Sequence, residues 1–213
     1  MTRYLMWWLS IAAISTFLCG CGDRASGVPQ FDRSNSGGYG VPEFKDDAPA
    51  NASVSVGTFP QSFVDCNGDT VDLTLYRGKK KVVLVVLRGV PKSEKGEFCP
   101  SCIAQAGSLI ANRREFEELA TEVLVVFPGP SERRGEFFQK VVKRTPSEPQ
   151  WLFRILLDQD CSACTQLGIR DDFAKPSTYI LDTQGDVVYA YVGETSTDRP
   201  SVKAILDQLK KAK

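Results

Sequence analysis

The sequence predicts an α/β protein with a mixed central sheet, helices on both faces of that sheet and a β-hairpin at the start of the domain. Two observations carry this prediction. Apolar, β-branched runs of strand length alternate with segments whose apolar residues recur at helical spacing. The alternation ends in a hairpin and an amphipathic helix, an order that is typical of a sheet covered by helices.

The first hairpin is predicted from Asn67-Gly68, because both residues tolerate positive φ in a tight turn. The runs on either side of this turn, Ser62–Cys66 and Thr70–Leu73, are expected to be its strands. Cys66 then lies at the edge of the hairpin. It is either a third redox or intermolecular thiol or a tolerated surface cysteine.

The central part of the chain is expected to alternate between strands and helices. Lys81–Leu87 has the length and apolar character of a buried strand, and Ile103–Leu119 has apolar residues at helical spacing. Another short apolar strand follows over Glu122–Phe127. The next helix is expected over about 131–144, with acidic residues near its start and basic residues near its end, as the helix dipole favours.

The C-terminal part completes the predicted sheet. A strand is expected over 151–157, and a short helix follows Asp160. The strand Ser177–Leu181 is expected to pair by a hairpin with Val187–Val192. A last helix over about 201–211 has its apolar residues on one face, which predicts that it packs on the sheet.

The composition excludes several classes of function. Lysine plus arginine and aspartate plus glutamate number 26 each, so no excess of basic charge indicates nucleic-acid binding. The chain of 213 residues contains no histidine, which excludes serine–histidine and cysteine–histidine catalysis and histidine-ligated zinc or haem. The chemistry must then use thiols, carboxylates, lysine, arginine, tyrosine or the backbone. Seven cysteines are many for a cytosolic chain.

The N-terminus has the pattern of an export signal. Arg3 precedes a nearly continuous apolar run of about 15 residues, which is short for a bilayer span and suits the core of a signal peptide. Leu18-Cys19-Gly20-Cys21 resembles the lipobox of bacterial lipoproteins, and this resemblance implies that Cys21 is lipidated after cleavage. A short uncleaved anchor is the alternative. Either way, the domain is expected to be tethered to a membrane.

The chain is therefore expected to have three parts. Residues 1–20 are predicted to be the signal peptide, and 21–53, rich in Gly, Ser, Pro, Asp and Asn, a flexible tether that begins with the lipidated cysteine. Residues 54–213 are predicted to form one domain. This organisation predicts a protein of the cell envelope, anchored by lipid on the extracytoplasmic side of a membrane.

The stretch Phe98–Gln105 carries the chemistry, because Cys99-Pro100-Ser101-Cys102 stands where a helix begins after a buried strand. Unpaired backbone N–H groups and the helix dipole favour negative charge at this place. They lower the pKa of a thiol from its usual value of about 8.5. Pro100 suits the first helical position, where its missing N–H is not needed. We predict that Cys99 is the nucleophile and that Cys102, one turn on, is the resolving thiol.

Two further segments extend this pattern into a family resemblance. Val56–Pro60 precedes the Asn67-Gly68 turn, and Lys175–Asp182 contains Pro-Ser-Thr at the start of a strand. With the CPSC, they resemble the thioredoxin-like superfamily, in particular its redoxin branch of peroxiredoxin-like proteins and tethered thiol–disulfide oxidoreductases. The resemblance implies a thioredoxin-like sandwich. It also implies that Pro176 is a cis-proline that lies against the loop of Cys99 and Cys102.

Three charged residues are candidate modulators of the thiolate. Arg88 begins the polar insertion 88–97, which is either a flap for docking a partner or a solvated loop. Glu97 is either a proton relay for Cys102 or an ordinary exposed residue. Lys175 stands where the family carries an uncharged residue. Its charge would lower the thiolate pKa and make the protein more oxidising.

A second pair, Cys161-Ser162-Ala163-Cys164, also opens a short helix after a strand. Three interpretations remain open: a second dithiol that exchanges electrons with the first, a structural or regulatory disulfide, and a metal clip or inert thiols. A zinc site of four cysteines is disfavoured because 58 residues lie between the pairs, whereas ribbon-type sites have roughly 15–20. We expect neither a metal nor another cofactor.

Two activities use Cys99. The first is thiol–disulfide exchange with protein thiols and disulfides and an unidentified redox partner. The alternative is an antioxidant, peroxiredoxin-like reduction of hydroperoxides. Exchange is preferred because Lys92 and Gly96 occupy the positions where peroxiredoxins carry Pro and Thr or Ser, and no arginine stands at Pro176–Ser177, where the family carries one. A third possibility is a non-catalytic module for metal or haem assembly, which the lack of histidine and of a Met-rich face disfavours.

Overall fold

The computed structural model describes residues 44–90, 97–143, 153–172 and 174–212. They build a mixed sheet of seven strands in the order β2-β1-β5-β4-β3-β6-β7. The strands are β1 (Ser62–Asp65), β2 (Thr70–Asp72), β3 (Lys81–Val86), β4 (Thr121–Pro128), β5 (Arg154–Asp158), β6 (Ser177–Leu181) and β7 (Val187–Val192). The three central strands β3, β4 and β5 run parallel, and the outer strands join them antiparallel.

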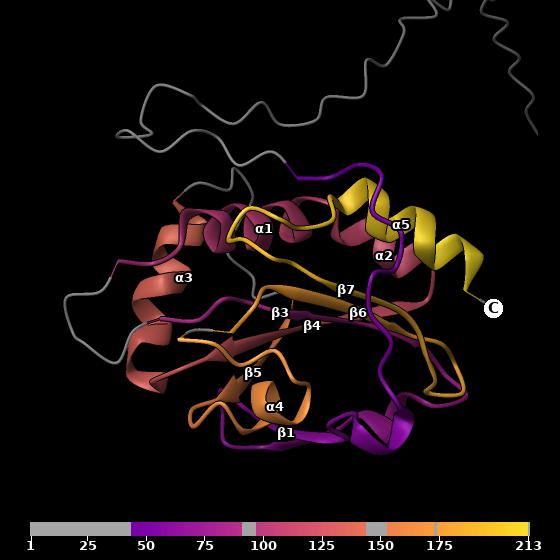
Figure 1. Ribbon diagram of the computed structural model, residues 1–213, viewed down its shortest axis with the longest axis horizontal. Helices are drawn as coiled ribbons and strands as arrows, with labels where there is room; N and C mark the ends of the chain where they lie inside the picture. Colours follow the sequence, from indigo (N-terminus) through magenta and orange to yellow (C-terminus); the bar gives the residue numbers. More distant parts are fainter. Residues whose placement is uncertain (1–43, 91–96, 144–152, 173, 213) are drawn as a thin grey trace, which may run out of the picture. The chain divides into compact units, whose positions relative to one another are not determined.

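Helices cover both faces of the sheet (Figure 1). The helices are α1 (Pro100–Ala111), α2 (Arg113–Glu118), α3 (Arg134–Val142), α4 (Ser162–Gln166) and α5 (Val202–Lys211), with short 3₁₀ turns at Val56–Thr58, Leu73–Tyr76 and Ser131–Arg133. Four of the helices pack on one face, and α4 lies on the other (Figure 1). In the part of the chain that the structure describes, no helix is long and apolar enough to cross a membrane.

The strand β3 divides the core in two. Val83 and Val85 face the four helices, whereas Val82, Leu84 and Val86 face α4 and the first hairpin. Successive side chains of a strand point to opposite faces, and a parallel strand at the centre of a sheet is buried on both faces. The uninterrupted apolar run in the sequence therefore marks the central strand of the sheet.

The predicted α/β class and the thioredoxin-like fold are confirmed, and two helices differ in detail. The helix expected over 103–119 is broken at Asn112, whose side-chain amide donates to the Ser108 carbonyl at 2.7 Å. An asparagine amide that bonds to a nearby carbonyl competes with the helix, so α1 ends and α2 begins at Arg113. The helix expected from residue 131 starts as a 3₁₀ turn and becomes α-helical only at Arg134.

The described N-terminal segment packs on the domain and is not a free tether up to residue 53. Ala48 is buried in the core, and Lys45 forms a parallel bridge with Pro200. The side-chain amide of Asn51 exchanges hydrogen bonds of 2.9 Å and 2.8 Å with the backbone of Val192 in β7. The segment thereby covers part of a sheet edge that would otherwise expose unpaired backbone groups.

One end of the sheet brings three segments together. Antiparallel pairing sets Ser177, at the start of β6, opposite Val86, at the end of β3. The Ala174 N–H donates to the Arg88 carbonyl at 3.0 Å. The segment before β6, which contains Pro176, therefore lies beside the end of β3. A Cβ added to Gly89 would approach the Pro128 carbonyl oxygen to 2.8 Å, so the chain passes very close to β4 here.

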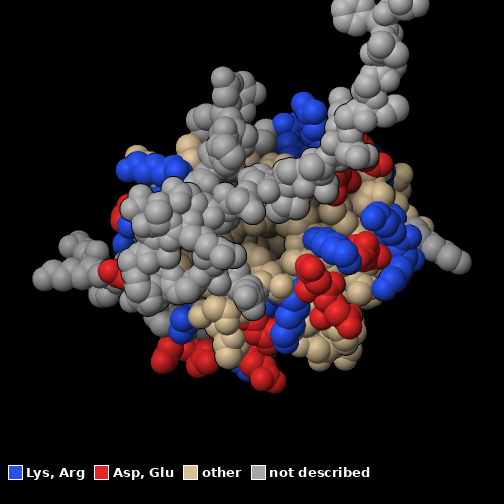
Figure 2. Space-filling view, turned by 90° about the horizontal axis from the view of Figure 1, so that it is seen from above, with Lys and Arg blue, Asp and Glu red and all other residues tan. Residues whose placement is uncertain are grey.

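The helical face carries charges of both signs. Figure 2 looks at the molecule from above, and where described residues are visible on that face, basic and acidic side chains lie side by side. This mixture agrees with the 26 basic and 26 acidic residues of the sequence. The visible described surface therefore shows no single-signed patch of the kind that steers nucleic acid.

Candidate redox site

The first dithiol stands at the start of α1. Cys99 is the residue that precedes the helix, and its carbonyl accepts the N–H groups of Cys102 at 3.0 Å and Ile103 at 3.2 Å. Pro100 occupies the first helical position, as expected. Cys99 is partly buried, whereas Cys102 is buried with 2% of its surface exposed. One sulfur is thus open to a substrate and the other is covered.

The residue before the dithiol anchors it to the fold. The ring of Phe98 is buried and lies 5.6 Å from the ring of Phe137 in α3, centroid to centroid. The guanidinium of Arg133 lies 4.5 Å over the Phe98 ring, an arrangement in which a cation is attracted by the ring face. Phe98 therefore fixes the approach of the chain to Cys99.

A buried arginine, Arg199, contacts the dithiol from the loop between β7 and α5. Its exposed fraction is 1%. Its Nη2 lies 3.1 Å from Cys102 Sγ and 3.9 Å from Cys99 Sγ. Its Nη1 donates to the side-chain carbonyl of Gln105 in α1, and its Nε donates to the Ser196 carbonyl at 2.9 Å. No carboxylate of the described residues contacts this guanidinium, and the groups in contact with it that can carry a negative charge are the two sulfurs.

The surroundings of the pair shift the pKa values of the two thiols in opposite directions. The hydrogen bond from the Cys102 thiol, the charge of Arg199 and the N–H groups of Cys102 and Ser101 lower the pKa of Cys99 to about 5, although partial burial acts against them. Burial, together with the bond to Cys99, raises the pKa of Cys102 well above its usual range. The two sulfurs therefore share one proton near neutral pH, and Cys102 carries it.

The backbone of Arg88 also takes part in the site. Its N–H donates to Cys102 Sγ at 3.3 Å. The candidate modulators Glu97 and Lys175 are exposed, and neither takes part in the polar contacts described for the two sulfurs. Pro176 is buried and directly precedes Ser177, which lies opposite Val86 at the end of β3. Its cis geometry and the influence of Lys175 stay predictions.

Sequence reasoning missed Arg199, because an arginine was sought near Pro176 and Ser177. The loop that carries Arg199 passes over that proline: a Cβ on Gly193 would meet Pro176 Cγ at 3.1 Å and overlap the Asp198 carbonyl. Gly193 directly after a strand was the one local signal of this close approach. Nothing in the sequence near residue 199 indicated that its side chain is buried.

The second pair lies on the other face of the sheet. Cys161 precedes α4 with φ of 58°, and Cys164 is fully buried. The Asp158 carboxylate accepts the N–H groups of Ala163 at 3.1 Å and Cys164 at 3.0 Å. Burial, followed by the neighbouring Asp158, raises the pKa of Cys164. Cys102 belongs to the core under α1 and Cys164 to the core under α4, so the sheet separates the pairs.

Cys66 is separate from both pairs. It is partly buried and lines a cavity of about 930 Å³ between the first hairpin and α3. Arg134 of α3 donates to the Cys66 carbonyl at 3.0 Å. All five cysteines that the structure describes are thiols. Among these described residues, no group of three or more potential ligands is arranged to hold a metal ion.

A thioredoxin-like sheet with a dithiol at the start of a helix, beside a buried cation, defines a thiol-dependent oxidoreductase. The sequence profile of the AhpC/TSA family matches residues 45–190. The chain belongs to this family. None of the curated protein sequences compared with the chain matches it.

Solved structures with the same fold include peroxiredoxins. Peroxiredoxin 6 of Arenicola marina has 14% identity and a TM-score of 0.63, with 74% of this chain and 73% of that chain covered. Peroxiredoxin Q of Xanthomonas campestris has 18% identity and a TM-score of 0.55, with 78% and 98% covered. Peroxidoxin BcpB of Mycobacterium tuberculosis has 19% identity and a TM-score of 0.53, with 78% and 99% covered. These similarities show the fold.

Proposed function

We propose that this protein is a thiol–disulfide oxidoreductase in which Cys99 attacks and Cys102 resolves. The observation that supports this function best is that one guanidinium nitrogen of Arg199 contacts both sulfurs, at 3.1 Å and 3.9 Å. The two sulfurs are thus held side by side at the start of α1. Such a pair closes to a disulfide and reopens with little movement of the helix.

In the first step, the Cys99 thiolate attacks one sulfur of a disulfide in a partner protein. The new bond joins Cys99 Sγ to that sulfur, and the other partner sulfur leaves as a thiolate that takes a proton from the solvent. Cys99 suits this step because its pKa of about 5 keeps it ionised at neutral pH. It is also the less buried of the two sulfurs.

In the second step, Cys102 attacks Cys99 Sγ and releases the partner's remaining sulfur as a thiol. The proton of Cys102 goes to this leaving group. The Arg88 N–H at 3.3 Å and the Arg199 guanidinium at 3.1 Å point at Cys102 Sγ, so both stabilise the negative charge that develops there. Two electrons pass from the dithiol to the partner's disulfide, and a reduced dithiol partner reverses the reaction.

Reduction of hydroperoxides is the second candidate, supported by the match to the AhpC/TSA family and by the peroxiredoxin fold. The Cys99 thiolate would attack one peroxide oxygen, the O–O bond would break, and the other oxygen would take a proton from the solvent and leave as an alcohol or water. The Cys102 thiol would then attack the sulfur of the Cys99 sulfenic acid and form the disulfide. The hydroxyl group of the sulfenic acid would leave as water with the proton of Cys102. A thiol-containing reductant would reopen the disulfide. Arg199 supplies a buried cation beside Cys99.

The cellular setting is part of the proposal. The signal-peptide pattern and the lipobox-like segment support a lipid on Cys21 that holds the domain at the extracytoplasmic side of an envelope membrane. Protein thiols and disulfides are the proposed partners. Mass spectrometry of the mature N-terminus tests the anchor, and an intact Met1 or an unmodified Cys21 would contradict it.

The experiment for the activity is stopped-flow kinetics of the reduced full-length chain, once with hydrogen peroxide and once with a disulfide-bearing protein. We expect rapid disulfide exchange that is lost in Cys99→Ser and stalls at a mixed disulfide in Cys102→Ser. The reaction with peroxide should be no faster than that of a free thiol. Rapid peroxide consumption that Cys99→Ser abolishes would replace exchange with the second candidate.

A further inference from the structure

The loop that carries Arg199 is held in place by the N-terminal segment Lys45–Asn51. This loop runs from Gly193 to Ser201, between β7 and α5. The Lys45 N–H donates to the Arg199 carbonyl at 2.8 Å, and the Ser201 N–H donates to the Lys45 carbonyl at 2.8 Å. The backbone of Lys45 thus pairs on both sides of Pro200.

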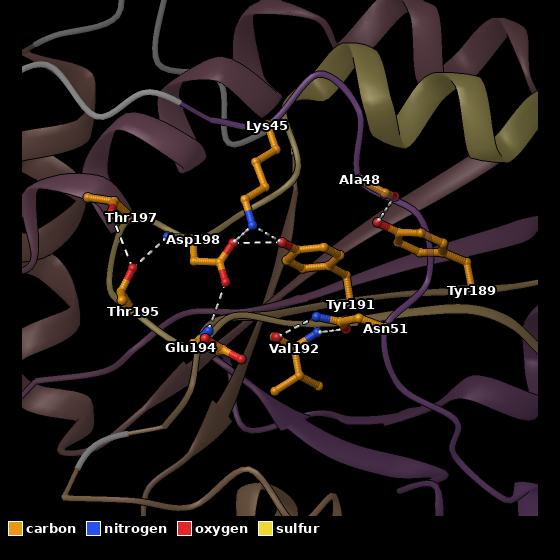
Figure 3. A network of polar contacts seen from close by, with 10 residues as sticks. All are labelled: Lys45, Ala48, Asn51, Tyr189, Tyr191, Val192, Glu194, Thr195, Thr197 and Asp198. Carbon is orange, nitrogen blue, oxygen red and sulfur yellow. Dashed lines mark hydrogen bonds and ion pairs between the residues drawn. The ribbon is translucent and has the colours of Figure 1, made fainter.

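The side chain of Lys45 completes this attachment (Figure 3). Its Nζ lies 2.7 Å from Asp198 Oδ1 and 2.9 Å from the Tyr191 hydroxyl. That hydroxyl donates to Asp198 Oδ1 at 2.6 Å, and the Glu194 N–H donates to Asp198 Oδ2 at 3.0 Å. Lys45, Tyr191 and the Glu194 backbone therefore use both oxygens of the carboxylate.

These contacts keep the Asp198 carboxylate away from its neighbour in the sequence, Arg199. Asp198 is the acidic residue next to Arg199, and its side chain is only 13% exposed. The bonds from Lys45, Tyr191 and Glu194 outweigh burial and lower the pKa of Asp198, while the same ion pair raises the pKa of Lys45. Both groups are thus charged at neutral pH. The Arg199 guanidinium contacts the sulfurs, Gln105 and the Ser196 carbonyl instead.

Among the described residues, the polar contacts of the two sulfurs come from three places in the fold. Cys99 directly precedes α1, and Cys102 lies in its first turn. The loop before α5 contributes the Arg199 guanidinium, and the segment after β3 contributes the Arg88 backbone N–H. A buried charge that loses its partner is strongly unfavourable unless another opposite charge contacts it. Without Lys45, the mostly covered Asp198 side chain would have Arg199 as the nearest cation along the chain.

We propose that Lys45 and Asp198 are positioning residues of the redox site, and that the segment Lys45–Asn51 is a strap that holds Arg199 on the dithiol. Lys45 forms an ion pair with the Asp198 carboxylate, so this carboxylate does not pair with Arg199. The charge of Arg199 therefore acts on the sulfurs. The strap lies within residues 21–53, which the sequence predicted to be a flexible tether. This inference rests on the proposed function only in that the thiolate of Cys99 is the reactive group.

The test is the pH dependence of alkylation at Cys99 in the reduced full-length chain. Iodoacetamide is the probe, and peptide mass spectrometry separates Cys99 from the other cysteines. In Lys45→Met we expect the midpoint of the Cys99 profile to move to higher pH and the rate at pH 6 to fall several-fold. Lys45→Arg should restore both. Lys203→Met, which removes an exposed ion pair on α5, should leave both unchanged.

A double variant separates positioning from a general loss of structure. In Lys45→Met/Asp198→Asn the competing carboxylate is gone, so the midpoint should return toward that of the unmodified protein. The strap is refuted if Lys45→Met leaves the midpoint in place while Arg199→Met moves it, or if the double variant is no better than Lys45→Met. Alkylation needs no partner protein or peroxide, so the result stands apart from the outcome for the proposed activity.

Discussion

The two Cys-x-x-Cys pairs of this protein share a local design and differ in their charged neighbour. Each first cysteine precedes the first turn of a helix that follows a central parallel strand, β3 for Cys99 and β5 for Cys161. At the first pair the neighbour is the guanidinium of Arg199. At the second it is the carboxylate of Asp158.

We expect the opposite charges to give the two pairs opposite redox preferences. A cation beside a dithiol stabilises the thiolate and hence the reduced form, which makes the disulfide a stronger oxidant. A buried carboxylate disfavours the thiolate, so the second pair is expected to remain a disulfide more readily once oxidised. The same spacing therefore occurs in two different electrostatic settings. We expect the charge beside each pair, and not the spacing, to determine its reactivity.

Among the variants, Arg199→Met should reduce the rate of disulfide exchange most. Loss of a hydrogen-bonded charge of this kind should slow disulfide exchange by roughly 10- to 100-fold at pH 7, since such bonds contribute about 1.5–3 kcal/mol. The midpoint of Cys99 alkylation should rise in the same variant. The matched control is Arg170→Met, because Arg170 lies near the second pair, where it bonds to the Asp160 carbonyl and Thr165.

An unchanged exchange rate in Arg199→Met would remove the charge difference as the explanation of reactivity. So would an equal loss in the Arg170 control.

The second prediction concerns Asp158→Asn. Loss of the charge weakens the bonds to the backbone of Ala163 and Cys164, so unfolding in urea should need about 1–3 kcal/mol less free energy. The exchange rate of Cys99 should stay the same, because the sheet separates the two sites. A loss of exchange activity with the folded state intact would show that the two pairs are coupled.

The third prediction uses the direction of the pKa shifts. The pKa of Cys99 falls from the ordinary 9.0 to about 5 in the folded state. The stability it contributes is therefore present above the unfolded pKa and is lost as the pH falls through about 5. Burial raises the pKa of Cys164, so its contribution is present below the unfolded pKa and is lost at alkaline pH.

Urea unfolding of the reduced chain, Cys99→Ser and Cys164→Ser between pH 4.5 and 9.5 measures both contributions. The difference between the chain and Cys99→Ser should grow from pH 5 upwards. The difference for Cys164→Ser should shrink above about pH 8.5. Parallel curves would contradict the assigned directions.

Much of the fold was predictable because its signals are local. The apolar run of β3, the Asn67-Gly68 turn and the amphipathic face of α5 each specify an element from neighbouring residues alone, and all three are confirmed. The break at Asn112 was missed because one side-chain bond to Ser108 decided it. The packed segment 45–52 was missed because its contacts, such as that of Lys45 with Pro200, lie far away in the sequence.

In the candidate site, too, the parts with local sequence signals were predictable and the parts formed by distant residues were not. The dithiol was readable because spacing, Pro100 and the start of the helix lie within four residues. Arg199 was not, because 97 residues separate it from Cys102 and only the folded loop buries it. The Asp158 carboxylate, six residues from Cys164, was within local reach. The strand predicted over 151–157 ends directly before it, but no pattern in the sequence shows that its oxygens accept N–H groups of α4.

The smallest expected effect is that of Lys175→Thr, which tests whether an exposed charge near the dithiol matters beside a buried one. Lys175 is exposed, and water and salt screen an exposed charge strongly. The Cys99 alkylation midpoint and the reduction potential of the pair should therefore move much less than in Arg199→Met, and any shift should vanish in high salt. A shift as large as that of Arg199→Met would show that Lys175, and not the buried arginine, sets the redox poise. No shift at all would leave Arg199 as the cation that distinguishes the first pair from the second.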